Sequence, residues 1–214
     1  HLRLKKGKED ATRYRERYGV PTLKRPPGSL IWFHAASVGE SLSILTLVDH
    51  LNRRYPTLNF LITTSTMSSA KLIEQRLPKK SFHQFVPFDA KRWVRRFLAY
   101  WQPSLAIWIE SELWPNLTLE TSSQKIPLIL LNARLSDRSY QRWRWLKGFI
   151  KSLLNCFAFC ISPSSEQASR LKSLGASNVI TIGNLKFSSN PLSYQENDLK
   201  ELQTKIKQRP TWLA

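Results

Sequence analysis

Short apolar runs alternate with longer amphipathic stretches along most of this chain. The runs are rich in β-branched and aromatic residues and predict strands, whereas the longer stretches have helical spacing. The predicted strands cover residues 30–33, 60–63, 82–86, 105–109, 126–131, 157–161 and 179–182. The predicted helices cover residues 42–54, 68–77, 90–101, a segment that starts near Pro115, and 136–154. This alternation is typical of βα units, and the continuous apolar strands indicate a parallel sheet with helices on both faces.

The amino-terminal end of the chain differs from this body. Residues 7–18 are highly charged and predict a helix, in which Glu9, Arg13 and Arg17 have the i,i+4 spacing of ion pairs. A proline-rich connector follows at residues 21–27. We therefore treat residues 1–28 as a separate basic helical segment.

The carboxy-terminal end also differs. Residues 188–193 form a polar linker, and residues 195–207 predict a short charged helix. From Arg209 onward a proline-led apolar segment has the pattern of a strand start, although no further strand follows for it to join. The expected division is thus an α/β domain over residues 29–187, followed by a linker, a helix and the start of another domain over residues 188–214.

Charge is the unusual feature of the composition. Hydrophobic residues make up 42% and charged residues 22% of the 214 residues, which indicates a folded chain and excludes disorder over most of its length. The formal net charge is +18. Such an excess of cations predicts a polyanionic partner, either nucleic acid or an anionic lipid surface.

Three features are missing from the sequence: a metal-binding cysteine and histidine cluster, a membrane span and a phosphate-binding pattern. Cys156 and Cys160 have no histidine close by to complete a metal shell, so we interpret them as buried thiols in a reducing compartment. No stretch reaches the ~18 apolar residues of a membrane span. The phosphate-binding patterns G-x-x-x-x-G-K-[ST] and G-x-G-x-x-G do not occur either, so nucleotide binding within this chain is not supported.

Polar residues follow several of the predicted strands directly. In open α/β sheets ligands bind beyond the carboxyl ends of the strands, so these positions are the candidates for chemistry. They are the segments HAASVGE (residues 34–40), TST (64–66), ESELWPN (110–116) and NAR (132–134).

Glu40 has two possible roles. With Ser37 it has the spacing of a capping box, in which Ser37 accepts from an amide of the first helical turn, Glu40 reaches back to the N-cap amide, and Gly39 permits close packing. The same position places a carboxylate at the positive end of a helix, beside the expected cleft. There it could remove a proton from a sugar hydroxyl.

The other strand-end residues also have two interpretations each. His34 suits a hydrogen-bonded histidine at a strand end as well as a catalytic group. Arg134 suits an ion pair with Glu110 as well as a ligand contact. Trp114 and Pro115 fit a simple helix start with proline in the first turn.

Two predicted helices mix cations with aromatic residues, which suits either a solvated face or a surface that meets anionic lipid or phosphate. Arg92 and Arg95 lie near Trp93, Phe97 and Trp101 on one of them. The other helix carries Arg142 and Arg144 together with Arg138, Lys147, Tyr140, Trp143 and Trp145.

Four motifs together resemble the Kdo transferases, the 3-deoxy-D-manno-octulosonic acid transferases that build the inner core of lipopolysaccharide. They are HAASVGE at 34–40, ESELWPN at 110–116, NARLS at 132–136 and GNLKF at 183–187. They occur in the family's order over nearly the whole chain, and residues 7–19 resemble the basic segment that follows the family's membrane anchor.

The resemblance implies a Rossmann-like domain, the amino-terminal, acceptor-binding half of a GT-B glycosyltransferase. It implies that Glu40 is the general base that activates the 6′-hydroxyl of the lipid A precursor, lipid IVA, for transfer of Kdo from CMP-Kdo with inversion. The acceptor-binding positions would be His34, Ser37, Gly39, Glu110, Asn132 and Arg134. The resemblance predicts no metal or cofactor, a donor domain beyond this chain, inactivity of this chain alone, and a location at the cytoplasmic face of the inner membrane.

Arg92, Arg95, Arg142 and Arg144 are the residues expected to face that anionic membrane. The alternative from another class is a basic nucleic-acid-binding α/β domain without catalytic activity, suggested by the same net charge. The sequence has no recognisable nucleic-acid-binding motif, and its cations lie on predicted helices rather than in one basic tail. We therefore expect no nucleic acid among the partners.

Overall fold

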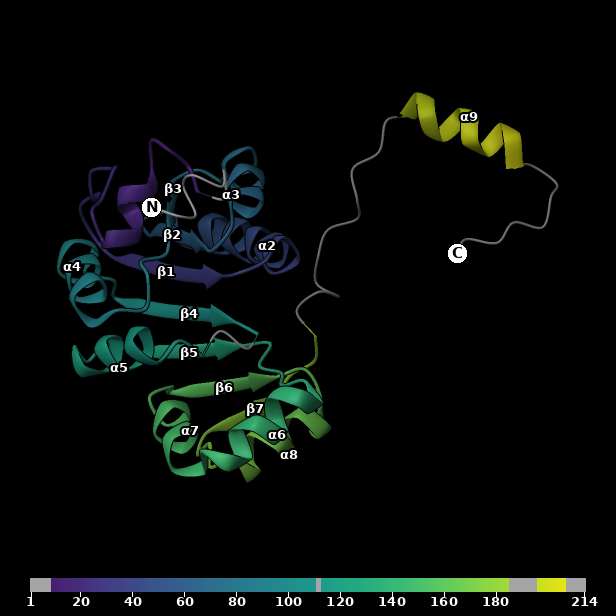
Figure 1. Ribbon diagram of the computed structural model, residues 1–214. Coiled ribbons are helices and arrows are strands. Elements are labelled where there is room, and N and C mark those ends of the chain that lie inside the picture. The colour runs from purple at the N-terminus through teal and green to yellow at the C-terminus, as the bar shows by residue number, and fades with distance from the viewer. Residues whose placement is uncertain (1–8, 111–112, 185–195, 207–214) are drawn as a thin grey trace.

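The computed structural model describes residues 9–110, 113–184 and 196–206. Seven strands form one parallel sheet in the order β3-β2-β1-β4-β5-β6-β7, shown in Figure 1. The strands are β1 (Leu30–Ala35), β2 (Asn59–Thr64), β3 (Ser81–Phe85), β4 (Leu105–Ile109), β5 (Leu128–Leu131), β6 (Phe159–Ser162) and β7 (Val179–Thr181). The predicted fold class and all seven strands are confirmed.

The helices begin where the sequence supplies a suitable cap. They are η1 (Tyr14–Tyr18), α2 (Val38–Arg54), α3 (Met67–Glu74), α4 (Lys91–Trp101), α5 (Pro115–Ser123), α6 (Asp137–Trp145), α7 (Lys147–Leu154), α8 (Ser165–Ser173) and α9 (Glu196–Ile206). Ser37, Thr66, Ser136 and Ser164 each accept a hydrogen bond from an amide in the first turn of α2, α3, α6 and α8. These caps satisfy amides that a helix otherwise leaves unpaired.

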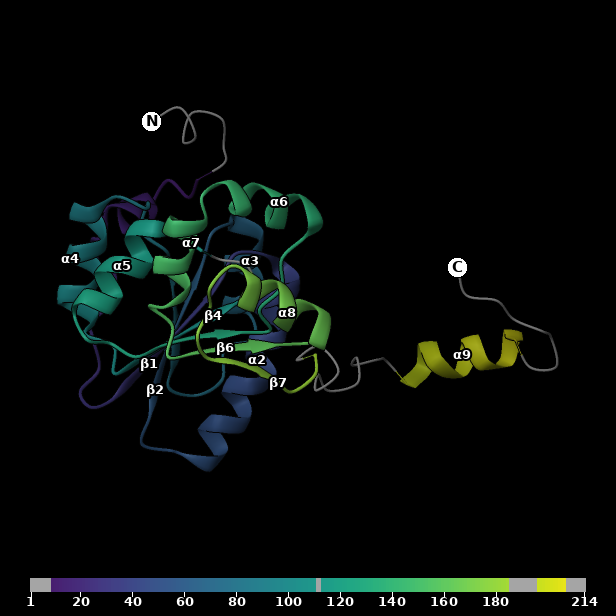
Figure 2. The same ribbon diagram turned by 90° about the horizontal axis from the view of Figure 1, so that it is seen from below.

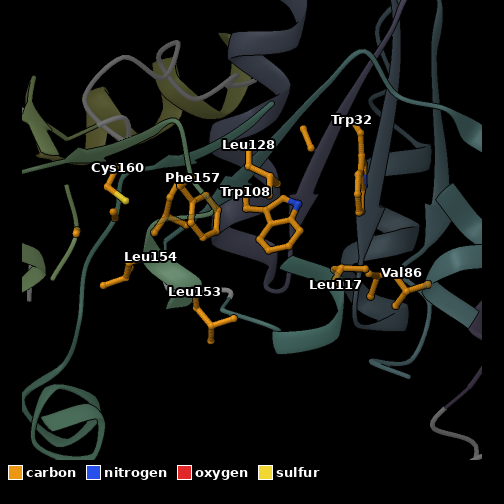
Figure 3. Close-up of a cluster of buried hydrophobic side chains, with 14 of the residues drawn as sticks. Trp32, Val86, Trp108, Leu117, Leu128, Leu153, Leu154, Phe157 and Cys160 are labelled. Atoms are coloured by element: carbon orange, nitrogen blue, oxygen red, sulfur yellow. The ribbon is translucent and has the colours of Figure 1, made fainter. Parts of the chain in front are cut away.

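Both faces of the sheet are covered, as Figures 1 and 2 show. Alternate residues of each strand point to opposite faces, so β1 sends Trp32 into one core cluster and Phe33 into the other. The larger cluster lies under α4, α5, α7 and α8, and part of it is drawn in Figure 3. The smaller cluster lies under α2 and α3. This two-sided burial explains why the strands read as continuous apolar runs.

The long helix predicted over residues 136–154 is two helices. Leu146 leaves the helical region with φ −113° and ψ 41° and separates α6 from α7. Gly148, two residues later, weakens helix propagation at this point. The chain therefore turns between the two helices, and the prediction of one continuous helix is wrong.

The amino-terminal segment is helical only in part. Residues 14–18 form the short 3-10 helix η1, and the predicted i,i+4 pairs do not form. Instead Arg17 pairs with Glu9, eight residues away, at 3.1 Å, and Arg13 pairs with Glu16 at 2.9 Å. Gly19 ends η1 with φ 69°, and a Cβ there would collide with the carbonyl oxygen of Trp93. Glycine thus lets η1 lie directly against α4.

The remaining predictions about the chain have mixed outcomes. The sheet lies within the predicted domain of residues 29–187, and α9 matches the helix predicted at 195–207, although the domain boundaries themselves remain predictions. The linker at 188–193 and the strand start after Arg209 lie outside the described residues. No helix in the part of the chain described is both long and apolar enough to cross a membrane.

The two cysteines differ in environment. Cys160 is buried on β6, and burial raises the pKa of its thiol to about 12. Cys156 is half-buried and donates from its thiol to the carbonyl oxygen of Ser152 at 3.3 Å. The prediction of buried thiols is therefore confirmed for Cys160 and wrong for Cys156, because the sequence places Cys156 just after α7, ahead of the strand.

Candidate functional site

The candidate site lies where the strand order reverses. The chain proceeds from β1 to β2 and β3 on one side, and from β4 to β5, β6 and β7 on the other. The loops that follow two adjacent parallel strands, β1 and β4, therefore lead in opposite directions and leave a crevice at the carboxyl edge. The loop after β1 carries Ser37, Glu40 follows in the first turn of α2, and Glu110 comes directly after β4.

Glu40 lies in the first turn of α2 and is held by the loop that precedes the helix. Its side chain is 8% exposed, and its carboxylate accepts from the amide of Ala36 at 2.9 Å and from the hydroxyl of Ser37 at 2.7 Å. The Ser37 oxygen in turn accepts from the Glu40 amide at 3.4 Å. The capping box is confirmed with one correction, since Glu40 reaches the amide of Ala36 and not that of Ser37.

This geometry leaves Glu40 able to accept another hydrogen bond. Each carboxylate oxygen offers two acceptor positions, and one bond from the loop occupies a position on each. A Cβ placed on Gly39 would meet no described atom within 4 Å, so the expected close packing at Gly39 is wrong. The space beside Gly39 is open, and the carboxylate is fixed at the positive end of α2.

His34 is fully buried within β1. Its Nδ1 lies 3.0 Å from the hydroxyl and 3.2 Å from the carbonyl oxygen of Thr63 on β2. The indole of Trp32 donates to the same Thr63 hydroxyl at 2.8 Å. These contacts favour a positioning role for His34, which lies in the strand that precedes Ser37 and Glu40.

Glu110, Asn132 and Arg134 are brought together by β4 and β5. The amide of Asn132 donates to the Glu110 carboxylate at 3.3 Å, and the Arg134 Nε lies 4.0 Å from the same oxygen. The Arg134–Glu110 pairing considered from the sequence is therefore an ion pair at long range, too long for a hydrogen bond.

The backbone at this point is unusual. Glu110 has φ 61° and Asn132 has φ 57°, and both residues directly follow a strand. Asparagine tolerates the left-handed region, whereas glutamate rarely adopts it. Such conformations gather at functional sites, where the surrounding structure holds a side chain in a required position.

The four arginines expected to face a membrane are all exposed. On α4, Arg95 pairs with Glu120 at 2.6 Å, and the Arg92 guanidinium lies 4.6 Å from the ring centre of Trp93. On α6, Arg144 donates to the neutral side chain of Gln141 at 3.3 Å, and Arg142 is also exposed.

Two residues with structural roles at this edge were missed from the sequence. Asp89 accepts from the amide of Leu117 at 2.7 Å and so caps α5, whose start at Pro115 was predicted correctly. Arg17 donates to the carbonyl oxygens of Val86 at 3.1 Å and Ser65 at 2.6 Å. Both contacts join segments far apart in the chain, so no local pattern signals them.

Within the described ranges, no group of three or more His, Cys, Asp or Glu residues could hold a metal ion.

Solved structures share this architecture. A putative UDP-N-acetylglucosamine 2-epimerase from Listeria monocytogenes matches with a TM-score of 0.60 at 13% identity, over 82% of this chain and 51% of that chain. The Anabaena protein HepE, crystallised with UDP and glucose, matches with a TM-score of 0.54 over 84% of this chain and 50% of that one. The fold is thus that of one half of a GT-B enzyme.

Sequence comparison defines the family. The family model described as 3-deoxy-D-manno-octulosonic-acid transferase matches residues 12–189, so the chain belongs to the Kdo transferase family. The Kdo transferase of Rickettsia bellii is 39% identical over 97% of this chain and 50% of its own length. That of Haemophilus influenzae is 32% identical over 94% of this chain and 48% of its own length. The chain therefore spans about half the length of the curated relatives it matches.

Proposed function

We propose that this chain is the acceptor-binding half of an inverting glycosyltransferase that moves Kdo from CMP-Kdo to lipid IVA. The observation that carries the proposal is the Glu40 carboxylate, fixed by Ala36 and Ser37 at the amino end of α2 beside the crevice between β1 and β4. Membership of the Kdo transferase family supports the transfer of Kdo as the reaction.

In the proposed step, Glu40 accepts the proton of the acceptor hydroxyl while the hydroxyl oxygen attacks the anomeric carbon of Kdo. The bond from that carbon to the CMP phosphate breaks as the new glycosidic bond forms, so the configuration inverts. The hydrogen bonds from Ala36 and Ser37 hold the carboxylate in place before the substrate arrives. His34, Ser37, Gly39, Glu110, Asn132 and Arg134 are the proposed acceptor-binding residues, and no metal or other cofactor is proposed.

CMP-Kdo is proposed to bind a second domain, because nucleotide-binding patterns are lacking in this sequence. Catalysis requires both reactants in one geometry, so we expect no transfer by this chain alone. CMP-Kdo should leave its melting temperature nearly unchanged, because a ligand stabilises only a native state that binds it. A clear rise in melting temperature with CMP-Kdo would contradict this assignment.

The basic surface is proposed to dock on the anionic cytoplasmic face of the inner membrane, where the acceptor resides. Arg92, Arg95, Arg142 and Arg144 would supply cations, each worth about 1 kcal/mol near such a surface. The surface of α6 and α7 gives stronger support than that of α4, because Trp145, Leu146 and Phe149 are exposed there beside the cations.

Glu40→Gln in the complete two-domain enzyme tests the catalytic assignment. The glutamine oxygen can still accept from Ala36 and its NH₂ group can donate to Ser37, so the cap and the melting temperature should persist. Proton removal is lost, and general-base catalysis contributes about 100- to 10,000-fold in rate. Transfer of Kdo to lipid IVA should fall by that factor.

Glu166→Gln is the matched control, because Glu166 also lies in the first turn of a serine-capped helix, α8, on the surface. Its transfer rate should stay at the wild-type level. If Glu40→Gln also retained the wild-type rate, Glu40 would be only a capping residue, and Glu110 and His34 would become the candidates for the base.

A further inference from the structure

A small cavity opens at the carboxyl edge of β2 and β3. Its volume is about 150 Å³, and its lining includes Glu9, Arg17, Ser65, Val86, Phe88 and Trp114. We call it the β2–β3 pocket. Ala35 pairs with Thr64 in the sheet, so the next residues, Ala36 and Ser65, also lie on neighbouring strand ends. Because adjacent strands are about 4.8 Å apart, the Ser65 wall of the pocket lies near Ala36, whose amide donates to Glu40.

One residue of the pocket wall carries a polar group without a partner. The Ser65 hydroxyl is buried and has no hydrogen-bond partner in the described structure. A buried polar group left unpaired is destabilising, and native proteins leave few of them. The Ser65 hydroxyl on the wall of the pocket is therefore a candidate for a polar contact with a bound molecule.

The charges in the pocket argue against a phosphate ligand. Arg17 and Glu9 are both buried and form an ion pair at 3.1 Å. The two terminal nitrogens of the same Arg17 guanidinium donate to the backbone oxygens of Val86 and Ser65. The positive charge is therefore neutralised, and most of its donors are already used. An anion would gain little here and would meet the Glu9 carboxylate.

The walls of the pocket suit a sugar ring. Trp114 lies in the wall and is partly exposed, so the C–H face of a pyranose can pack on its ring, whereas the ring of Phe88 already packs against Tyr18 and Trp93. Glu9 and Ser65 supply oxygen atoms for hydroxyl groups. Pockets for larger ligands usually hold about 300–1,000 Å³, so this volume suits a single ring and not a nucleotide.

We propose that the β2–β3 pocket binds the pyranose ring of the acceptor, with Trp114 against the ring face and Ser65 hydrogen-bonded to the ring hydroxyls. This inference rests on the proposed function and specifies where the acceptor sugar lies relative to Glu40. It assigns binding roles to Ser65 and Trp114, which are separate from the residues proposed above.

Titration of this 214-residue chain with N-acetylglucosamine, followed by NMR chemical shifts, tests the pocket without any transfer reaction. Trp114→Leu should weaken binding at least tenfold, because the ring loses its aromatic face, and Ser65→Ala should weaken it several-fold. Trp145→Leu is the matched control, since Trp145 is 89% exposed on α6 and should leave affinity unchanged. Melting temperatures of all variants should match the wild type within a few degrees.

Unchanged affinity in Trp114→Leu and Ser65→Ala would overturn the pocket assignment, as would an equal loss in Trp145→Leu. Displacement of the sugar by inorganic phosphate would show an anion site instead. Glu40→Gln separates this proposal from the proposed function, because that variant should bind N-acetylglucosamine normally. If sugar binding fails while Glu40→Gln still abolishes transfer in the complete enzyme, the pocket proposal falls and the proposed function stands. If the sugar binds as described while Glu40→Gln transfers Kdo normally, the catalytic assignment falls and the pocket remains a sugar site.

Discussion

Helix α4 and the α6–α7 pair have the same composition of arginine and aromatic residues but opposite surroundings. On α4, Phe97 and Trp101 are fully buried in the larger core cluster. On α6 no residue is buried, and Trp145 is 89% exposed. Figure 2 shows both helices on the same side of the sheet. Composition alone therefore does not show whether a basic aromatic helix covers the core or forms a surface.

The spacing of the apolar residues explains the difference. Val94, Phe97, Leu98 and Trp101 follow the i, i+3, i+4, i+7 pattern of one helix face. On α6, only Tyr140 and Trp143, three residues apart, pack at the edge of the core, and Trp145 lies off that face. The cations of the two regions also differ in their surroundings. Lys91 and Arg95 of α4 both form ion pairs with Glu120, which neutralises part of the charge of α4. The α6–α7 surface is thus the better candidate for an external partner.

The largest expected effect is on the free energy of unfolding, which should respond to a substitution on α4 but not to one on α6. Phe97→Ala should reduce the free energy of unfolding by about 3–5 kcal/mol, because it leaves a cavity in the core. Trp145→Ala should change it by less than about 0.5 kcal/mol, as is usual at exposed positions. Urea denaturation followed by circular dichroism measures both. Similar losses in the two variants would show that the α6–α7 surface is covered in solution.

The β3 edge of the sheet should also be sensitive to acid through His83, which contacts Glu74 of α3. Burial lowers the pKa of His83 to about 3, with further lowering by Arg13 and Arg17, while Glu74 lies 3.6 Å from its Nδ1. The unfolded chain binds a proton near pH 6.5 and the folded chain does not. Stability should therefore fall as the pH drops from 6.5 toward 3, by up to roughly 1.4 kcal/mol per pH unit.

Unfolding measured at pH 7 and pH 5 with His83→Gln tests this dependence. The variant should lose much of the difference between the two pH values, whereas the exposed His50→Gln should retain it. An unchanged pH dependence in His83→Gln would assign the acid sensitivity to other groups.

Vesicle binding tests the comparison at the surface. Reversing Arg142 and Arg144 to Glu should weaken association with anionic vesicles by at least about 2 kcal/mol, or roughly 30-fold, at low salt. Reversing Arg92 and Arg95 to Glu should also weaken it, and should lower the melting temperature because Glu120 loses its partner. Added salt should reduce binding of the wild type. If neither double variant changes association in co-sedimentation, the docking surface lies elsewhere.

The smallest expected effect concerns two glycines. Gly148→Ala in α7 should stabilise the protein by about 0.5–1 kcal/mol, since a Cβ there meets no described atom within 4 Å and alanine favours the helix. Gly19→Ala should destabilise it, because that Cβ would collide with Trp93 of α4. Thermal unfolding of the two variants checks both signs. Stabilisation by Gly19→Ala would mean that η1 does not lie against α4 in solution.

Features set by neighbouring residues could be predicted from the sequence. The strand at residues 105–109 was placed correctly, and Ser37 and Glu40 form their capping box because both partners lie within one helical turn. The strand predicted from Ile126 begins instead at Leu128, because Pro127 between them lacks an amide hydrogen for the sheet.

Features that join distant segments could not be predicted. The break at Leu146 has no proline to mark it, and the bond from Asp89 to Leu117 spans two different βα units. The left-handed backbone of Glu110 was also missed, because glutamate carries no preference for that conformation. At the candidate site the sequence therefore identified the residues, while their contacts required the fold.

The central position of β1 has a consequence for synthesis of the protein. One edge of β1 pairs with β2, but its other edge pairs with β4, which begins at Leu105. At translation rates of about 5–20 residues per second, roughly 4–14 seconds pass between completion of β1 and the arrival of β4. During that interval the first three strands can assemble, while an apolar strand edge stays open to chaperones and to other nascent chains.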